Sequence, residues 1–498
     1  MSLSWQALTA SLIILPLILA RRVLKALLMG RTAVPPEVWF PAVPGELKVR
    51  KTVGAGEESY ERMNIKTFLE ARVPSLFAGF KPTWWLPNGH VQTIYMTLAD
   101  FTNVDQVVYE RTLLRTPDGG SLGLDVTPPS SSDYAHTLSD DTPIIVVKHG
   151  LTGGSYEPYV RSILASACKP KSEGGLGYRA VVINFRGCAG TKITSPQFYS
   201  AGHTDDLRTG LLFISERWPR APLVGIGFSL GANVLTRYLG EEGAQSRLRG
   251  GIVLACPWDT KLNANRLQDH WFSREVYGRA LGKNVMNLFK RHLDEVNALP
   301  KGNRLEPQVP IILGLKNPTL MEMDEAMIRV VGGNSPPFPF PTAQDYFQWA
   351  QSHPALRTIR VPFLALNTKD DPIVAYNPTH EVAHSSTCAL AITHAGGHLG
   401  WFHGSSNPIA SLRSQKPADR WVREPVLEFL RAVAEDYVPD EKVGPRPREE
   451  GVIVDKTSGF VMEVGNDMVG YKIIEEGEII SGAEFANAMK ATSGGAGL

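Results

Sequence analysis

Short apolar runs rich in β-branched residues recur along this chain, and the segments between them have the periodicity of amphipathic helices. The runs lie at residues 144–150, 178–185, 223–228, 251–256, 362–367 and 389–394. Helical patterns at 156–168, 204–218 and 230–240 separate the first four. Strands that are apolar throughout are buried on both faces, which is typical of a parallel sheet covered by helices on either side. The sequence therefore predicts an α/β fold with a mostly parallel central sheet.

The interval between the fourth and fifth runs breaks this rhythm. Residues 259–360 separate two predicted strands, where about 15 to 20 residues normally suffice. An amphipathic pattern at 273–299 predicts one or two helices, and a stretch rich in proline and aromatic residues follows at 335–350. An insertion at the carboxyl edge of a sheet is placed to cover a site there. We therefore expect a helical cap inserted before the strand at 362–367.

An uncharged stretch, WQALTASLIILPLILA, occupies residues 5–20 and is followed by Arg21, Arg22, Lys25 and Arg31. As a helix it would cover about 24 Å of a hydrocarbon layer about 30 Å thick, so it spans only if flanking arginines reach the headgroups. We predict that residues 1–30 form a membrane anchor; a helix packed on the protein and a cleaved signal peptide are the alternatives. Basic charge after the stretch favours a cytosolic position for the following domain. We expect the membrane to be that of the endoplasmic reticulum or of a lipid droplet.

The remaining segments flank a core that we assign to residues 106–435. Residues 31–105 are interpreted as a linker and N-terminal extension, because prolines and glycines are dense between 30 and 60. The core begins with a predicted hairpin whose turn is PDGG at 117–120. Residues 436–498 are interpreted as a partly disordered appendage with a β-like pattern at 452–480. The net charge of +1, from 51 basic and 50 acidic side chains, argues against nucleic acid as a partner.

The sequence GFSLG at 227–231 joins the run at 223–228 to the helical pattern at 230–240. A GxSxG sequence between a strand and a helix is typical of a strained turn that lifts a serine hydroxyl clear of a sheet. We predict that Ser229 is a nucleophile; a tight turn without chemistry is the alternative.

A serine hydroxyl at neutral pH needs a base to remove its proton and a carboxylate to orient that base. In this class of site the three follow one another as serine, acid and histidine. The loop TKDDPIV after the fifth run offers Asp370 and Asp371, and GGHLGWF after the sixth offers His398. We predict His398 as the base and Asp371 as the acid, because DPIV beginning at Asp371 resembles the acid loop usual in such sheets. Asp370 remains the alternative.

Two backbone donors must stabilise the oxyanion that forms when an ester is attacked. The Leu230 amide, which opens the helix after Ser229, is one candidate. The Leu151 amide in HGLTGG (149–154) is the other, unless that segment is only a flexible turn. No metal or nucleotide cofactor is expected. The sequence HTDD at 203–206 is explained by Thr204 capping a helix with two aspartates in its first turn.

Taken together, these stretches resemble the AB-hydrolase 4 family of the α/β-hydrolase superfamily, which includes fungal medium-chain acyl-CoA:ethanol acyltransferases and animal membrane-anchored lipases. The resemblance covers about residues 80–435, and its cap matches least well. It implies an α/β-hydrolase fold with Ser229, Asp371 and His398 as a catalytic triad, acting on acyl esters at membranes. The matching stretches are WWLPNGHVQTI (84–94), KHGLTGGSYEPYV, NFRGCAGT (184–191), HTDDLR, GFSLGANVL, ACPWD, LNTKDDPIV and GGHLGWF.

The resulting hypothesis is a serine hydrolase that cleaves lipophilic, medium-chain carboxylic esters through an acyl-enzyme on Ser229. Its partners would be an ester or acyl-CoA substrate and the surface of a membrane or lipid droplet. One alternative is an acyltransferase that moves the acyl group from acyl-CoA to a small alcohol, because the same acyl-enzyme serves both reactions. Another, of a different class, is a catalytically silent lipid-binding protein with the same fold.

Overall fold

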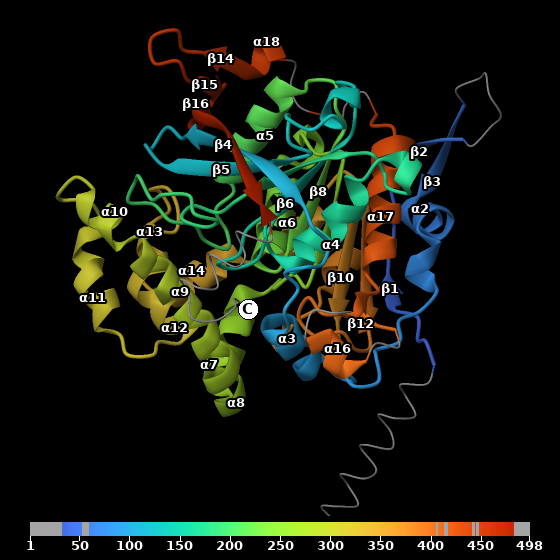
Figure 1. Ribbon diagram of the computed structural model, residues 1–498, viewed down its shortest axis with the longest axis horizontal. Helices are drawn as coiled ribbons and strands as arrows, with labels where there is room; N and C mark the ends of the chain where they lie inside the picture. The colour runs from blue at the N-terminus through green and yellow to red at the C-terminus, as the bar shows by residue number, and fades with distance from the viewer. Residues whose placement is uncertain are drawn as a thin grey trace, which may run out of the picture.

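A twelve-stranded sheet runs through the computed structural model, with helices packed on both of its faces (Figure 1). The structure describes residues 32–51, 59–404, 407–412, 417–440, 444 and 448–482. The predicted anchor at 1–30 lies outside these residues. Among the residues described, no helix combines the length and the apolar character needed to cross a membrane.

The six apolar runs form the parallel centre of the sheet, as predicted. Neighbouring strands in the order β7-β6-β8-β9-β10-β11 are all parallel, and every residue in them is buried. Their carboxyl ends therefore meet at one edge of the sheet. The strands are β6 (Ile144–Lys148), β7 (Arg179–Ile183), β8 (Leu223–Phe228), β9 (Gly250–Leu254), β10 (Phe363–Thr368) and β11 (Cys388–Thr393).

Successive residues of each strand face opposite sides of the sheet, which splits the core in two. In β6, Ile145 and Val147 belong to one hydrophobic cluster, while Ile144 and Val146 belong to another. Helices α2 (Ile65–Arg72), α4 (Pro158–Ala167) and α17 (Arg423–Arg431) cover the first face, and α5 (Asp205–Arg217) and α6 (Leu230–Glu242) cover the second. The predicted parallel sheet with helices on both faces is confirmed.

Antiparallel strands extend the sheet at both edges. The predicted hairpin is present as β4 (Val108–Arg115) and β5 (Ser121–Thr127), and β5 pairs with β7. At the other edge β1 (Glu37–Trp39) pairs with β11.

Further pairing in the N-terminal region, between β2 (Glu46–Arg50) and β3 (Tyr60–Asn64), shows that the linker interpretation is wrong for the strand residues between 37 and 60. Prolines made this segment look irregular, but Pro41 and Pro44 lie between β1 and β2, where they interrupt no ladder hydrogen bond.

The C-terminal segment is built into the same sheet. Strand β16 (Asn466–Ser481) pairs antiparallel with β4, and β15 (Val461–Glu463) and β14 (Val452–Val454) continue outward. Val469, Tyr471 and Ile480 of β16 are buried in the core. The appendage interpretation is therefore wrong for residues 466–481. The physical reason is that β4 would otherwise present an unpaired edge, which β16 satisfies.

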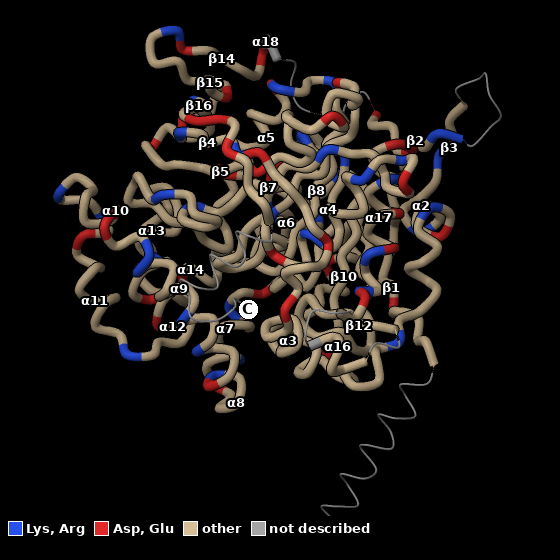
Figure 2. The backbone as a smooth tube through the Cα atoms, viewed as in Figure 1, with Lys and Arg blue, Asp and Glu red and all other residues tan. Residues whose placement is uncertain are grey.

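The segment between β9 and β10 is helical and lies beside the end of the sheet where β8 ends (Figure 1). It has a hydrophobic core of its own, which includes Phe289, Met327 and Phe347, so it is a packed cap rather than a loose loop. Acidic and basic residues are interspersed over the whole fold (Figure 2). The cap helices are α7 (Thr260–Asp269), α8 (Trp271–Ser273), α9 (Arg279–Arg291), α10 (Leu293–Ala298), α11 (Val309–Gly314), α12 (Leu320–Met323), α13 (Arg329–Val331) and α14 (Ala343–Ala350).

Candidate active site

Ser229 occupies a strained turn between β8 and α6. Its backbone angles, φ of 50° and ψ of −118°, lie in a region that residues other than glycine rarely adopt. The flanking glycines make the turn possible because the backbone passes very close on both sides. A Cβ on Gly227 would lie 2.7 Å from the Cα of Ala232, and one on Gly231 would lie 2.3 Å from the carbonyl oxygen of Lys148. The serine is thus fixed at the carboxyl edge of the sheet.

His398 and Asp371 come from the loops after β11 and β10 and meet Ser229 at this edge. His398 Nε2 lies 2.7 Å from Ser229 Oγ, and His398 Nδ1 lies 2.8 Å from Asp371 Oδ2. The other carboxylate oxygen of Asp371 accepts hydrogen bonds from the amides of Ile373 (2.8 Å) and Val374 (3.0 Å). The structure thus brings the three predicted side chains together, with the hydroxyl hydrogen-bonded to the imidazole and the imidazole to the carboxylate. In this arrangement the imidazole can take a proton from the hydroxyl.

Asp370, the alternative acid, faces away from the imidazole ring. Its carboxylate accepts hydrogen bonds from the amides of Gly89 (2.6 Å) and Gly397 (3.1 Å) and from the Thr368 hydroxyl (3.1 Å). Burial raises the pKa of Asp370 above its ordinary value. Asp370 therefore joins the loop that carries His398 to the start of α3 (Gly89–Leu98).

Helix α3 supports the histidine in a way that sequence reasoning missed. The Thr93 hydroxyl accepts a hydrogen bond from the backbone amide of His398 (2.9 Å) and donates one to the carbonyl oxygen of Gly89 (2.7 Å). Gly397, with a φ of 60°, packs so closely that a Cβ would lie 2.3 Å from that same carbonyl oxygen. The stretch WWLPNGHVQTI contributed to the family resemblance but was given no role. The signal available in the sequence was the adjacent polar pair Gln92 and Thr93 within a stretch that also contains several apolar residues.

The two predicted oxyanion donors lie beside Ser229. Leu151 and Leu230 both line the same pocket as the serine, and a Cβ on Gly150 would lie 3.5 Å from the Cβ of Ser229. Across the part of the chain that the structure describes, neither the Leu151 amide nor the Leu230 amide donates a hydrogen bond to a protein acceptor. Within the described residues, neither N–H group is thus already paired, as an oxyanion donor requires.

A buried network, also missed from sequence, holds the loop that carries Leu151. The Asp125 carboxylate on β5 accepts hydrogen bonds from Arg111 on β4 (2.6 and 2.8 Å), from the Ser155 hydroxyl (2.6 Å) and from the Asn184 amide (2.8 Å). Asp125 is completely buried, and so are Ser155 and Asn184. The HGLTGG and NFRGCAGT stretches are thus tied to the first hairpin, which holds the loop that carries Leu151.

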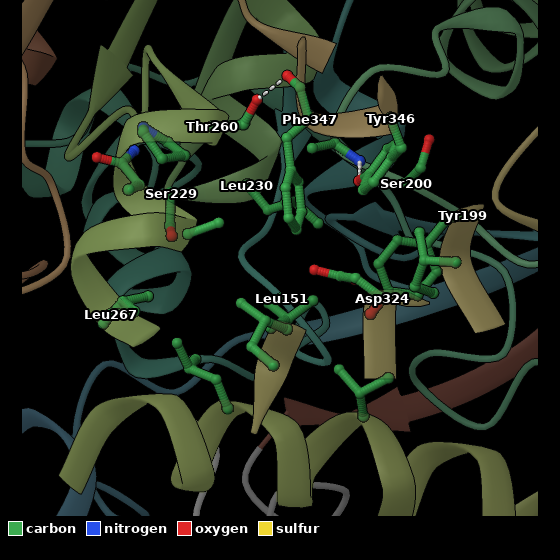
Figure 3. A pocket seen from close by; sticks show the side chains of 18 of the residues that line it. Leu151, Tyr199, Ser200, Ser229, Leu230, Thr260, Leu267, Asp324, Tyr346 and Phe347 are labelled. Carbon is green, nitrogen blue, oxygen red and sulfur yellow. Dashed lines mark hydrogen bonds between the residues drawn. The ribbon is translucent and has the colours of Figure 1, made fainter. Parts of the chain in front are cut away.

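A pocket opens next to Ser229, between the sheet edge and the cap (Figure 3). Its volume is about 960 Å³ when the open mouth is included. Its lining is mainly apolar and includes Leu267, Leu281, Val285, Leu288, Met327, Ile328, Phe347 and Ile373. This lining suits an alkyl chain, because binding removes the apolar surface of both the chain and the pocket from water.

The HTDD stretch begins α5 as predicted, with Thr204 at the N-cap position and Asp205 and Asp206 in the first turn. The Thr204 hydroxyl, however, makes no cap hydrogen bond to the backbone of α5, because it donates to the Glu241 carboxylate on α6 (2.7 Å). Asp206 is paired with Arg186 at 2.7 Å. The described residues contain no group of His, Cys, Asp and Glu side chains arranged to hold a metal ion.

Comparison with known proteins assigns the family. Residues 143–400 match the family model described as the alpha/beta hydrolase fold, which is more than half of the chain. The chain belongs to the α/β-hydrolase fold family. The family resemblance predicted from the motifs is confirmed, and the matched span runs from β6 to the loop that carries His398.

Similar proteins of known name act on lipid esters, as their names state. The chain is 29% identical to monoacylglycerol lipase of Saccharomyces cerevisiae, over 78% of this chain and 89% of that protein. It is 30% identical to medium-chain fatty acid ethyl ester synthase/esterase 2 of the same yeast, over 71% and 89%. It is 28% identical to human phospholipase ABHD3, over 70% and 78%.

Proposed function

We propose that the protein is a serine hydrolase of lipophilic carboxylic esters. The observation that carries this proposal is the pair of hydrogen bonds that link Ser229 to His398 (2.7 Å) and His398 to Asp371 (2.8 Å). Ser229 and His398 line a mainly apolar pocket, which Leu151 and Leu230 also line, and the backbone amides of these two leucines have no protein acceptor within the described residues. These are the groups that acyl transfer to a serine requires, which supports the proposal.

The reaction then follows from the positions of the atoms. Ser229 Oγ bonds to the ester carbonyl carbon while His398 Nε2 takes the hydroxyl proton, and Asp371 stabilises the resulting imidazolium. The amides of Leu151 and Leu230 donate to the oxyanion. His398 returns the proton to the departing alkoxide, which leaves as the alcohol and gives the acyl-enzyme. His398 then takes a proton from water as the water oxygen attacks the acyl carbon, and returns it to Ser229 Oγ as the bond between Oγ and the acyl carbon breaks, which releases the free acid.

The proposed substrates are medium-chain esters. Two observations support this choice: the apolar pocket between cap and sheet, and the lipid esters named in the yeast and human relatives. The cap supplies most of the lining, so the length of chain accepted depends on residues such as Leu281 and Met327.

Acyl transfer from acyl-CoA to a small alcohol is a second candidate. It is favoured by the name of the yeast ethyl ester synthase/esterase, of which the chain covers most of the length. The enzyme carries out transfer rather than hydrolysis when an alcohol reaches the acyl-enzyme before water does, and a dry apolar pocket promotes that outcome.

Labelling with a fluorophosphonate probe, followed by product analysis, tests these candidates. We expect the wild-type protein to be labelled at Ser229 and Ser229→Ala to remain unlabelled. Incubation with octanoyl-CoA, with and without ethanol, then separates free acid from ethyl ester. A folded wild-type protein that stays unlabelled and releases neither product would be a silent lipid-binding protein, and the enzymatic proposal would be wrong.

We also propose that the described domain meets a membrane through one apolar surface, formed by α3, α8 and α16 (Pro408–Leu412) with the residues next to them. Its exposed apolar side chains are Trp84, Leu98, Trp271, Phe272 and Ile409. The three helices touch: the His90 ring on α3 packs edge-on against Phe272 on α8 at 5.5 Å, and the Tyr95 hydroxyl on α3 donates to the carbonyl oxygen of Ser411 on α16. They lie together in the lower part of Figure 1. Exposed apolar patches of this kind favour a lipid surface.

Vesicle flotation of a chain that starts at residue 32 tests this surface. We expect the double change Trp84→Ser and Trp271→Ser to reduce the bound fraction severalfold. The control, Ile453→Ser on β14, removes an exposed apolar side chain from the edge strand at the top of Figure 1, away from α3, α8 and α16, and should bind as the parent does. Equal binding by all three proteins would rule this surface out.

A further inference from the structure

One acidic side chain, that of Asp324, is among the residues that line the pocket. Asp324 begins the five-residue π-helical turn Asp324–Ile328 of the cap, between α12 and α13, and only 6% of its surface is exposed. No hydrogen bond or ion pair to its carboxyl group occurs within the described portion of the chain. Figure 3 shows the carboxyl directed toward the open centre of the pocket, with Ser229 on the other side.

The surroundings of Asp324 determine its charge. Burial raises the pKa of its carboxyl well above the ordinary value, and no neighbouring cation opposes this effect. The titratable group that faces it is Tyr346 on α14, whose hydroxyl accepts a hydrogen bond from the amide of Ala201. Burial without a neighbouring cation favours the neutral carboxylic acid, which offers the pocket one O–H donor and one carbonyl acceptor.

A carboxyl group buried without a partner destabilises the folded protein. A ligand removes this penalty if it both accepts and donates a hydrogen bond, as an alcohol hydroxyl does. The apolar walls around Asp324 favour carbon chains elsewhere in the same ligand. The pocket therefore combines the Asp324 carboxyl group, among a few polar side chains that include Thr260 and Asn263, with a mainly apolar surface for alkyl groups.

We infer that the Asp324 carboxyl binds a hydroxyl group carried by the substrate ester, away from the bond that Ser229 attacks. This inference rests on the proposed esterase function for its substrate, but the binding itself does not depend on turnover. The hydroxyl belongs either to the acyl chain or to the alcohol part of the ester. Both sources offer the same chemistry to Asp324.

Three kinds of ester distinguish the sources: ethyl octanoate as the reference, ethyl octanoates with one hydroxyl at successive positions of the acyl chain, and ethylene glycol monooctanoate. We expect the wild type to prefer one hydroxylated ester over ethyl octanoate by about tenfold in kcat/KM, as one added hydrogen bond of about 1.4 kcal/mol implies. Asp324→Leu should abolish this preference. Asp324→Asn, which keeps a donor and an acceptor of the same size, should retain most of it.

Met327→Leu is the matched control, because it changes a side chain of the same cap turn without altering polarity. It should shift all the esters by the same factor. Any of three results would overturn the inference. The wild type could show no preference for a hydroxylated ester, Asp324→Leu could retain the preference, or Met327→Leu could lose it to the same extent as Asp324→Leu. A wild-type preference for octanoylcholine over every hydroxylated ester would also overturn the inference, because a cationic ammonium group favours the ionised carboxylate rather than the neutral acid.

Equilibrium binding of the same esters to Ser229→Ala separates this inference from the proposed function. If the wild type neither turns over nor reacts with a fluorophosphonate, the esterase proposal fails. Binding of the hydroxylated ester about tenfold more tightly than ethyl octanoate, and loss of this difference in the double variant Ser229→Ala with Asp324→Leu, would still support the role of Asp324.

Discussion

Replacing Asp371 by asparagine tests the proposed division of roles between the two adjacent aspartates. Asp371 Oδ1 accepts the amides of Ile373 and Val374, while Oδ2 lies 2.8 Å from His398 Nδ1. An asparagine that keeps its carbonyl oxygen on the two amides must turn its NH₂ group toward Nδ1. Because NH₂ only donates, Nδ1 becomes an acceptor and the ring proton moves to Nε2. Nε2 faces Ser229 Oγ and can then no longer accept the hydroxyl proton.

The size of the effect follows from this change of tautomer. The corresponding substitution in serine proteases, which have an unrelated fold, lowers kcat by about 10⁴. At about 1.36 kcal/mol per tenfold change in rate, that corresponds to about 5.4 kcal/mol of transition-state stabilisation. We expect the same order here, because His398 and Asp371 are only 4% and 2% exposed and water has little access to replace the carboxylate.

Asp370→Asn is the matched control for this prediction. Asp370 is the preceding residue and undergoes the same chemical change, but it contacts the amides of Gly89 and Gly397 rather than the imidazole ring. Its kcat should remain within about tenfold of the wild type, since the tautomer of His398 is unchanged. The assay is ethyl octanoate hydrolysis together with the rate of fluorophosphonate labelling, with thermal melting to show that both variants fold. An active Asp371→Asn beside an inactive Asp370→Asn would refute the assignment of the acid.

Three further changes test other parts of the structure. Gly231→Ala places a Cβ 2.3 Å from the Lys148 carbonyl oxygen, so urea denaturation should show a loss of about 3 kcal/mol or more; a loss below about 1 kcal/mol would contradict the close packing. Thr93→Val removes the acceptor for the His398 amide and should lower kcat about tenfold with little change in KM; unchanged kinetics would show that α3 does not position the histidine. Because burial raises the pKa of Asp324, the folded protein binds a proton there that the unfolded chain releases, and this group makes stability fall as pH rises above about 3.8. The advantage in Tm of Asp324→Asn over the wild type should therefore grow between pH 5 and pH 8, and a constant difference would mean that Asp324 is already ionised.

The parts of the fold that were predicted from sequence are those that local patterns determine. A run such as 223–228 is apolar at every position, so burial on both faces is the only arrangement that removes it from water. GxSxG then marks where that strand turns into a helix. Because parallel strands end at one edge, Ser229, Asp371 and His398 were expected to meet there without any knowledge of the loops.

The parts that were missed depend on partners distant in the chain. Strand β16 has glycines and many acidic residues, and its strand character depends on pairing with β4, more than 350 residues earlier. Thr93 and Asp125 look like ordinary polar residues until the fold places His398 against one and Ser155 against the other. No local periodicity encodes such contacts, so sequence reasoning found the reacting groups and missed the groups that hold them.

The pocket shows why substrate choice is harder to predict than chemistry. In the sequence LMEMDEAMIRV, nothing marks Asp324 as a pocket residue. In the structure Leu320, Asp324, Met327 and Ile328 all line the pocket, because spacings of three and four residues place them on one side of a helical segment. That this side faces the pocket rather than solvent depends on how the cap packs against the sheet. The position of Asp324 therefore follows from tertiary packing, while Ser229 and His398 follow directly from the ends of β8 and β11.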